Sequence, residues 1–209
     1  SKGAPLFVFG EDFSVSGNRE SFDWEMGGVR LEGCSLGLEG AFQVKNAAVA
    51  LAIVELLERG GVFSIPHDAR RRGLERARHP GRLEWISESI LLDGAHNVDA
   101  AVVLADHLRG LPRNQPRSLL LGMSSDKDVR LVASTLAPHV DRIFTTRCAH
   151  PKALDPEAVA AELTHLALPV EPAGPIEEAL PRVRQEEGVV VVAGSLFLAG
   201  AVRDLLGRA

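Results

Sequence analysis

The 209-residue sequence contains no tyrosine, two tryptophans and two cysteines. So few cysteines exclude a small domain held together by disulfides, and we expect Cys34 and Cys148 to be reduced thiols of a cytoplasmic protein. No apolar run approaches the ~18–20 residues that a membrane span needs, so we expect no membrane partner. No charged segment followed by an apolar core opens the sequence, which argues against a secretory signal. The net charge of −5 gives no support to a nucleic-acid partner.

The familiar signatures of nucleotide and metal binding are absent as well. The sequence has no G-x-x-x-x-G-K-[ST] phosphate loop, no G-x-G-x-x-G fingerprint and no cluster of cysteine and histidine with metal-ligand spacing. We therefore expect no metal site in this chain. If the protein uses a nucleotide, its phosphate-binding part must lie outside this sequence.

The apolar fraction of 45% is sufficient for a substantial core. Residues 1–79 combine three strand-like stretches, "PLFVFG", "SFDWEM" and "VRLEGCSL", with two helical stretches, 43–61 and 64–78. Pro80-Gly81 then breaks the chain, and we predict a domain boundary there. Because the first part has few strands to cover its helices, we interpret it as the trailing end of a larger domain and expect it to expose an apolar face.

The remaining part, residues 80–209, alternates strands with helices. The strand-like stretches are "RLEWI", "SILLDG", "RSLLLGM", "DRIFTT", "LPVEPA" and "GVVVVAGS", and the helical stretches are 98–109, 127–137, 156–166, 176–186 and 196–207. This alternation predicts an α/β domain with a mostly parallel sheet and helices on both faces.

Three of these strands end in polar residues, in "LLDGAHN", "LLLGMSSDKD" and "VVVVAGS". In open α/β sheets, ligands bind where the carboxyl ends of the strands meet the following helices. Asp93 is suited to accept hydrogen bonds from ribose hydroxyls or to hold the water shell of a cation, and His96 is suited to donate to an anion or carry a proton. Lys127 offers a mobile cation, and the N–H groups after Gly194-Ser195 offer an anion site.

Structural roles also account for these residues, and for "SSDKD" a plain capped helix start is the favoured interpretation. Asp93 and Asn97 are good residues for capping turns and helices, and Ser124, Ser125 and Asp126 are good N-cap residues. The functional interpretation therefore depends on the three strand ends occurring together.

The first part holds one further candidate site and one basic run. Gln43 and Asn46 lie three residues apart at the start of a helix, where an amide either reads the edge of an adenine or is simply solvated. The run "RRRGLERAR" either contacts phosphates or forms a solvated helix face, and the second interpretation is favoured.

Five stretches, in order, resemble motifs of the folylpolyglutamate synthase/dihydrofolate synthase family, within the Mur-ligase-like ATP-dependent amide ligases. "GAFQVKNAAVA" is similar to the family's G-x-H-Q-x-x-N-A-x-x-A, "PGR" to its P-G-R, and "DGAHNV" to its D-G-A-H-N-P. "DKD" and "GSLFLAG" match its D-K-D and its terminal G-S-x-[YF]-L-x-G. The match runs from about residue 37 to residue 200, and "DGAHN" and "GSLFLAG" carry most of it.

The resemblance implies the architecture and the ATP contacts. Residues 80–209 would form a Rossmann-like carboxy-terminal ligase domain, preceded in residues 1–79 by the end of a Mur-ligase-type ATPase domain. The family's ATP contacts fall on Asn46 near the adenine, Arg82 at the phosphates across the domain junction, and Asp93 on the ribose side.

The resemblance also implies the candidate catalytic residues. His96 and Ser195 fall where the family's carboxy-terminal domain shapes the site for the incoming glutamate, and Lys127 is the third candidate.

Several positions depart from the family pattern. Phe42 replaces a histidine, which removes a hydrogen bond, and Val98 replaces a proline that is favoured but not required in a first helical turn. Lys152-Ala153 stands where the family often has Arg-Ala, which weakens any bidentate contact with an anion. The family's phosphate loop, Mg²⁺ ligands and carbamylated lysine precede the region that this sequence matches.

For the full-length protein the resemblance implies a monomeric ligase that uses ATP and Mg²⁺. It would add L-glutamate to dihydropteroate or to folates through an acyl phosphate. We expect the 209-residue chain alone to be inactive, because it lacks the phosphate loop and the metal ligands. Two alternatives stay open: another amino-acid ligase of the Mur superfamily, and a non-catalytic nucleotide-binding α/β module.

Overall fold

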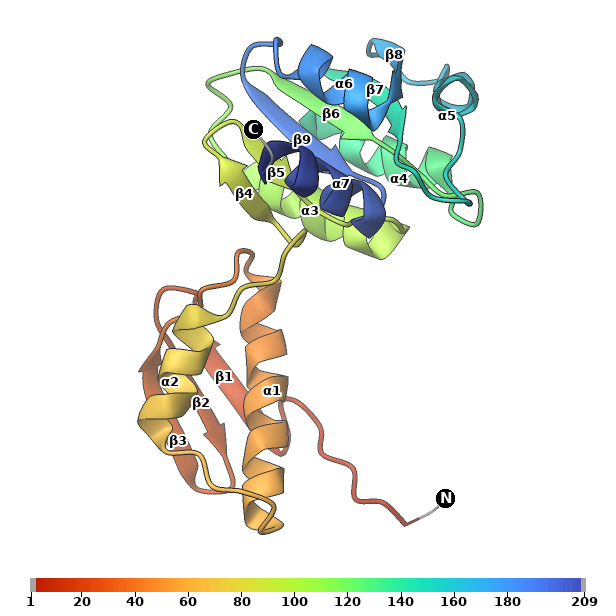
Figure 1. Cartoon of the computed structure of the whole chain (residues 1–209). Coiled ribbons are helices and arrows are strands. Elements are labelled where there is room, and N and C mark those ends of the chain that lie inside the picture. The colour runs from red at the N-terminus through yellow and green to blue at the C-terminus, as the bar shows by residue number, and fades with distance from the viewer. Residues whose placement is uncertain (1–2, 208–209) are drawn as a thin grey trace. The chain divides into compact units, whose positions relative to one another are not determined.

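The computed structural model describes residues 3–207, which form two compact units that divide between His79 and Pro80 (Figure 1). Each unit has its own buried apolar core. Among the helices of the described residues, none is both long enough and apolar enough to cross a membrane.

The first unit contains a three-stranded antiparallel sheet. Its strands are β1 (Phe13–Gly17), β2 (Phe22–Met26) and β3 (Val29–Cys34), in the order β1-β2-β3. Gly27 and Gly28 join β2 to β3, and their positive φ angles of +52° and +83° are those that a tight two-residue hairpin requires.

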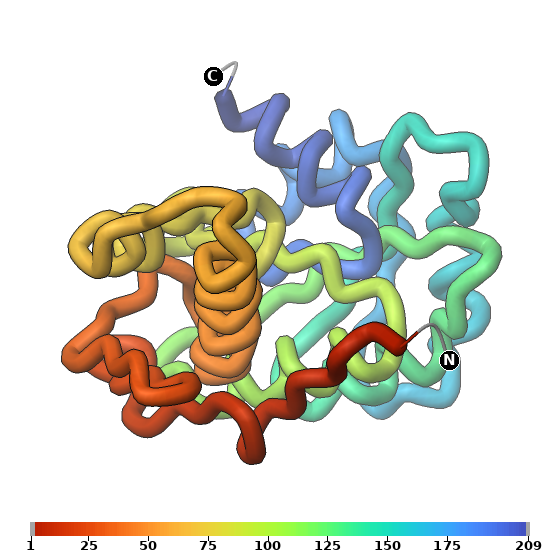
Figure 2. The backbone as a smooth tube through the Cα atoms, turned by 90° about the horizontal axis from the view of Figure 1, so that it is seen from below, coloured from red at the N-terminus to blue at the C-terminus, as the bar shows by residue number. Residues whose placement is uncertain are grey.

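Two helices cover this sheet. Helix α1 (Phe42–Arg59), which Figure 2 shows almost along its axis, contacts β1 and β2. The fully buried indole of Trp24 donates a 3.1 Å hydrogen bond to the Ala48 carbonyl and so ties the sheet to α1. Helix α2 (His67–Arg76) contacts β3. Both helices were predicted from the sequence.

The strand predicted for "PLFVFG" does not form, and that prediction was wrong. Residues 3–8 have no regular secondary structure, and the first strand begins at Phe13. The Val8 N–H donates to the Asp12 carboxylate at 2.7 Å, and the Gly10 N–H donates to the Phe13 carbonyl at 2.8 Å. These local bonds hold a turn, so the apolar run acquires no partner strand.

The arginine run of α2 is not a purely solvated face. Arg70 is buried, bonds Glu55 at 2.9 Å and also pairs with Glu58. Although burial raises the pKa of Glu55, hydrogen bonds from Arg70 and Arg59 outweigh it and hold that pKa below its usual value. The network therefore joins α2 to α1.

The second unit contains a six-stranded sheet in the order β4-β5-β9-β6-β7-β8, in which β4 is antiparallel to β5 and the other strands are parallel. The strands are β4 (Glu84–Ser87), β5 (Ile90–Leu92), β6 (Arg117–Leu121), β7 (Arg142–Arg147), β8 (Val170–Pro175) and β9 (Val189–Ala193). The predicted α/β class with a mostly parallel sheet is confirmed.

Helices lie on both faces of this sheet (Figure 1). They are α3 (Val98–Gly110), α4 (Val129–Leu136), α5 (Pro156–Glu162), α6 (Ile176–Val183) and α7 (Leu196–Gly207). Helices α6 and α7 share an apolar cluster with residues of β5, β6, β7 and β9, while α3 packs beside α4 on the opposite face. Because β5, β6, β7 and β9 are mutually parallel, the loops that follow them emerge at one edge of the sheet.

Candidate functional site

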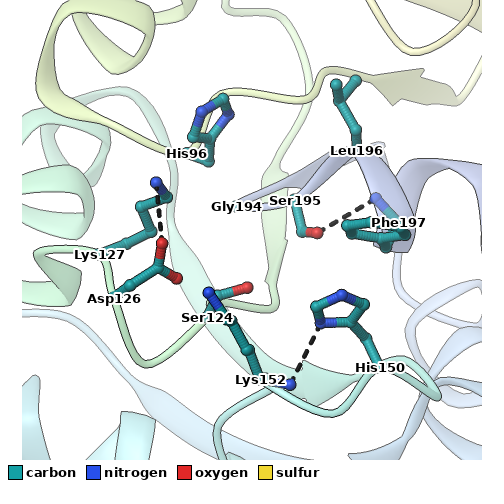
Figure 3. A pocket seen from close by; sticks show the side chains of 10 residues that line it. All are labelled: His96, Ser124, Asp126, Lys127, His150, Lys152, Gly194, Ser195, Leu196 and Phe197. Atoms are coloured by element: carbon teal, nitrogen blue, oxygen red, sulfur yellow. Dashed lines mark hydrogen bonds and ion pairs between the residues drawn. The ribbon is translucent and has the colours of Figure 1, made fainter.

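A pocket of about 370 Å³ lies at this edge, within the second unit (Figure 3). Loops after β5, β6, β7 and β9 and the first turn of α7 supply its walls. The lining residues are His96, Ser124, Asp126, Lys127, His150, Lys152, Gly194, Ser195, Leu196 and Phe197. The volume is in the range of small-molecule sites.

The loop after β5 contributes His96 to the pocket. Its Nδ1 lies 2.8 Å from the Gly94 carbonyl oxygen. A carbonyl only accepts, so Nδ1 must carry the proton, and in the neutral ring Nε2 keeps its lone pair. The next residue, Asn97, accepts a 2.9 Å bond from the Ala100 N–H and caps α3, as its residue type predicted.

Asp93, at the start of the same loop, braces a turn and does not line the pocket. Its carboxylate accepts from the Leu83 N–H at 2.9 Å and from the Ala95 N–H at 2.8 Å. Burial raises the pKa of Asp93, and these two bonds and the charge of Arg82 only partly oppose the effect. Asp93 therefore fixes the backbone beside Arg82, where Leu83 has a φ of +44°.

The loop after β6 contributes Ser124, Asp126 and Lys127. Helix α4 is capped by Asp128, which accepts a 2.9 Å bond from the Leu131 N–H, so the prediction of caps at Ser124–Asp126 was wrong. The Lys127 ammonium lies 3.2 Å from the Asp126 carboxylate and, by this bond above all, holds the pKa of Asp126 below its usual value. The loop before the cap is thus available to the pocket.

The loop after β9 contributes Gly194 and Ser195. The Gly194 N–H donates to the Ala95 carbonyl at 2.7 Å, which joins this loop to the loop after β5. The Ser195 hydroxyl oxygen accepts a 3.1 Å bond from the Phe197 N–H at the start of α7. Its own O–H stays available to donate to a ligand, although the residue is buried.

The loop after β7 completes the pocket with His150 and Lys152, which the sequence had not identified as site residues. The imidazole of His150 stacks on the Phe197 ring, with centroids 4.1 Å apart and planes 24° apart. The sequence does contain an indication that this loop belongs to the site, because "RCAHPKA" is a polar stretch that follows a fourth parallel strand. We noted Lys152 only as a departure from a family motif.

The structure therefore gathers the three predicted catalytic residues, His96, Lys127 and Ser195, around one pocket. Arg82 and Asp93 lie close enough to interact electrostatically, in the same unit but outside the pocket lining. Asn46 belongs to the first unit, where its exposed amide donates to Gln43 at 2.9 Å. Within residues 3–207, no group of three or more His, Cys, Asp or Glu is placed to hold a metal ion.

Residues 81–196 match the family described as "Mur ligase, glutamate ligase domain". A folylpolyglutamate synthase from Lacticaseibacillus casei is 30% identical over 98% of this chain and 49% of its own length. Escherichia coli FolC in complex with DHPP and ADP superposes with a TM-score of 0.82 and 25% identity, over 96% of this chain and 47% of that one.

A third relative is the bifunctional folylpolyglutamate synthase/dihydrofolate synthase from Yersinia pestis, complexed with AMPPNP and Mn ion. It superposes with a TM-score of 0.83 and 27% identity, over 98% of this chain and 48% of that one. The chain spans about half the length of these relatives. Because the matched region includes all six strands of the mostly parallel sheet and covers more than half of the sequence, the chain belongs to the Mur ligase family through its glutamate ligase domain.

Proposed function

We propose that the full-length protein is an ATP-dependent ligase that joins L-glutamate to dihydropteroate or to a folate. The observation that carries the proposal is the pocket, where His96, Lys127 and Ser195 meet at the strand ends within the region that matches the glutamate ligase domain. Cationic and hydroxyl groups converging on a small cavity suit an amino acid with two carboxylates.

The relatives support the choice of cosubstrates. Their names are those of folylpolyglutamate and dihydrofolate synthases, and two of them were solved with ADP and DHPP or with AMPPNP and Mn ion. In such a reaction ATP, with Mg²⁺ as the metal, supplies the phosphoryl group that activates the acceptor carboxylate as an acyl phosphate, and the amine of L-glutamate displaces phosphate from it.

The chain's own residues suit the second half of this reaction. An amino acid reaches the site as an ammonium ion and must lose a proton before it attacks. The Nε2 of neutral His96 is suited to take that proton, because Nδ1 already donates to Gly94. The Ser195 hydroxyl and the Lys127 ammonium are suited to bind and orient a carboxylate of the same substrate.

Following the family resemblance, we propose Arg82 and Asp93 of the second unit as ATP contacts and, separately, Asn46 of the first unit. The Asn46 amide is exposed, and within the described residues no carboxylate lies within ion-pair distance of the Arg82 guanidinium, so both groups are available to a ligand. The buried Asp93 accepts two backbone hydrogen bonds through its carboxylate and so braces the turn that carries Arg82. The Mg²⁺ ligands would come from another part of the protein.

The proposal also covers the domain that the first unit belongs to, the cellular compartment and the oligomeric state. We place the first unit at the end of an ATP-binding domain and the full-length protein in the cytoplasm as a monomer. Both cysteines, Cys34 and Cys148, are free thiols, which fits a reducing compartment.

The test is ADP release by the full-length protein with ATP and Mg²⁺. We expect release to depend on both L-glutamate and an acceptor, and separate assays with dihydropteroate and with a reduced folate identify the acceptor. The 209-residue chain alone is expected to release none. Release that depends on a different amino acid would identify another Mur-type ligase, and nucleotide binding without any turnover would favour a binding module.

A further inference from the structure

The loop from Cys148 to Ala153 is held firmly against the neighbouring strand end. The Ser125 N–H donates to the Lys152 carbonyl at 2.9 Å, and the Leu154 N–H donates to the Met123 carbonyl at 2.9 Å. Ser124 and Ala153 form an antiparallel bridge. The loop after β7 is therefore a fixed wall of the pocket.

His150 fixes the same loop from inside. Its Nδ1 accepts a 3.2 Å bond from the Lys152 N–H, while its ring stacks on Phe197 (Figure 3). Together with the bond to the Lys152 carbonyl, this contact restrains the Lys152 backbone on both sides of its Cα. The lysine stem thus begins at a defined place in the pocket wall.

The charged side chains that line the pocket do not balance, because two lysines, Lys127 and Lys152, stand against one acid. Among the described residues that line it, Asp126 is the one acid, and the Lys127 ammonium lies 3.2 Å from that carboxylate. Within residues 3–207 no carboxylate lies within ion-pair distance of the exposed Lys152 ammonium, although its charge acts on Asp126 from farther away and helps to lower the pKa of that carboxyl. An anionic group of a ligand is the partner that this arrangement favours.

The surroundings of Lys152 suggest which anion it takes. The wall beside it is the His150–Phe197 stack, an apolar surface that suits methylene groups. In Figure 3 His96 lies on the other side of the pocket from His150 and Lys152. A substrate whose amine lies near His96 and whose methylenes lie along the stack brings its side-chain carboxylate to Lys152.

We propose that Lys152 binds the side-chain carboxylate of the incoming amino acid, with His150 as its positioning residue, and thereby selects a dicarboxylic amino acid. The inference rests on the proposed ligase function and names a specificity determinant of the same site. Neither residue carries out bond making or breaking.

The first test is Lys152→Met in the full-length protein, which keeps the stem and removes the charge. We expect KM for L-glutamate to rise roughly tenfold to a hundredfold, because the variant loses one hydrogen bond between charged groups. We expect kcat and KM for ATP to stay within about twofold, because neither depends on this carboxylate. The preference for L-glutamate over L-glutamine in kcat/KM should fall by the same factor as KM rises, and Lys152→Arg should retain most of it.

His150 is tested by His150→Phe, which keeps an aromatic ring against Phe197 and removes the acceptor for the Lys152 N–H. We expect a smaller rise in KM for L-glutamate with kcat unchanged. In the double variant with Lys152→Met, the change at His150 should add nothing, because it acts through Lys152. A rise that adds fully to that of Lys152→Met would overturn the positioning role.

Arg147→Met is the matched control. Arg147 is an exposed cation at the end of β7 that lines a neighbouring cavity and not this pocket. We expect its KM for L-glutamate to stay within about twofold. Equal effects of Arg147→Met and Lys152→Met, or an unchanged KM in Lys152→Met, would overturn the inference while the ligase function stood. A wild-type protein without glutamate-dependent ADP release would instead remove the ligase proposal, and this one with it.

Discussion

Gly194 shows how one residue determines the shape of the pocket. Its φ is +107°, and an added Cβ would lie 2.4 Å from the Gly122 carbonyl oxygen. We expect Gly194→Ala to destabilise the fold by at least roughly 1–3 kcal/mol, since both the backbone conformation and the contact exclude a side chain. Urea unfolding measures this change. Gly200→Ala is the control, because a Cβ at this position within α7 meets nothing within 4 Å, and it should stabilise by about 0.5–1 kcal/mol.

His96 is predicted to act as a base. The variant His96→Gln keeps a polar side chain but has no group that takes up a proton near neutral pH. We expect kcat of the full-length protein to fall roughly 10²–10⁴-fold with KM for ATP unchanged. The pH profile of kcat should also lose its dependence on a group that must be deprotonated. A variant that keeps this pH profile would show that His96 only binds substrate.

Asp93 is expected to give stability a distinct pH dependence. Because burial raises its pKa in the folded protein, its contribution to stability is complete below the unfolded value of about 3.9 and is lost as pH rises through the higher native value. The asparagine in Asp93→Asn cannot ionise. The unfolding free energy of this variant relative to the wild type should therefore increase as pH rises from the unfolded to the native pKa of Asp93. Urea unfolding at a series of pH values gives this difference. Parallel curves for the two proteins would contradict the prediction.

At the scale of single residues, the sequence was informative where chemistry and position agreed. His96, Lys127 and Ser195 were identified because they follow buried strands, and the structure brings them together. Lys152 and His150 were missed because their loop is placed by contacts with the loop after β6, which are distant in sequence. The carboxylate of Asp93 accepts two backbone N–H groups, the capping role that its residue type allowed, and its predicted contact with ATP stays a prediction.

At the scale of elements, the start of α4 offers a direct measurement. Asp128 caps this helix through the Leu131 N–H, so Asp128→Ala should cost about 1 kcal/mol of unfolding free energy. Asp126→Ala, two residues earlier, should cause no measurable loss, because that carboxylate is exposed and caps nothing. Denaturant unfolding of the two variants compares them. A larger loss for Asp126→Ala would place the cap earlier, where the residue types alone had placed it.

The same helix shows what local patterns do and do not specify. All five helices of the second unit and its six strands were predicted, because strand-like apolar runs and helical segments alternate regularly there. The residue that caps α4 was not predicted. The sequence offers four good cap residues, and tertiary contacts of the loop decide which one caps the helix: Ser124, Ser125, Asp126 or Asp128. Likewise the apolar run Leu6–Phe9 has strand character but no partner strand, while the more polar Phe13–Gly17 pairs with β2.

At the scale of the whole molecule, the first unit has an exposed apolar face, as we expected because it has few strands to cover its helices. Val49, Ile53 and Leu57 lie four residues apart on α1 and are 44%, 53% and 39% exposed. They form one stripe along the helix, opposite the side that packs on β1 and β2. A continuous exposed apolar stripe on a helix favours contact with another surface.

The stripe should make the 209-residue chain associate with itself as its concentration rises. Sedimentation of the wild-type chain over a range of concentrations should show an average mass that rises with concentration. In Ile53→Lys this rise should begin at a higher concentration, because the variant places a charge in the centre of the stripe. Val102→Lys is the control, because Val102 is similarly exposed, at 45%, but lies on α3 in the second unit. If both variants shift the rise equally, added charge and not the stripe is responsible. If the wild-type chain stays monomeric throughout, the stripe alone is too weak to hold two copies together.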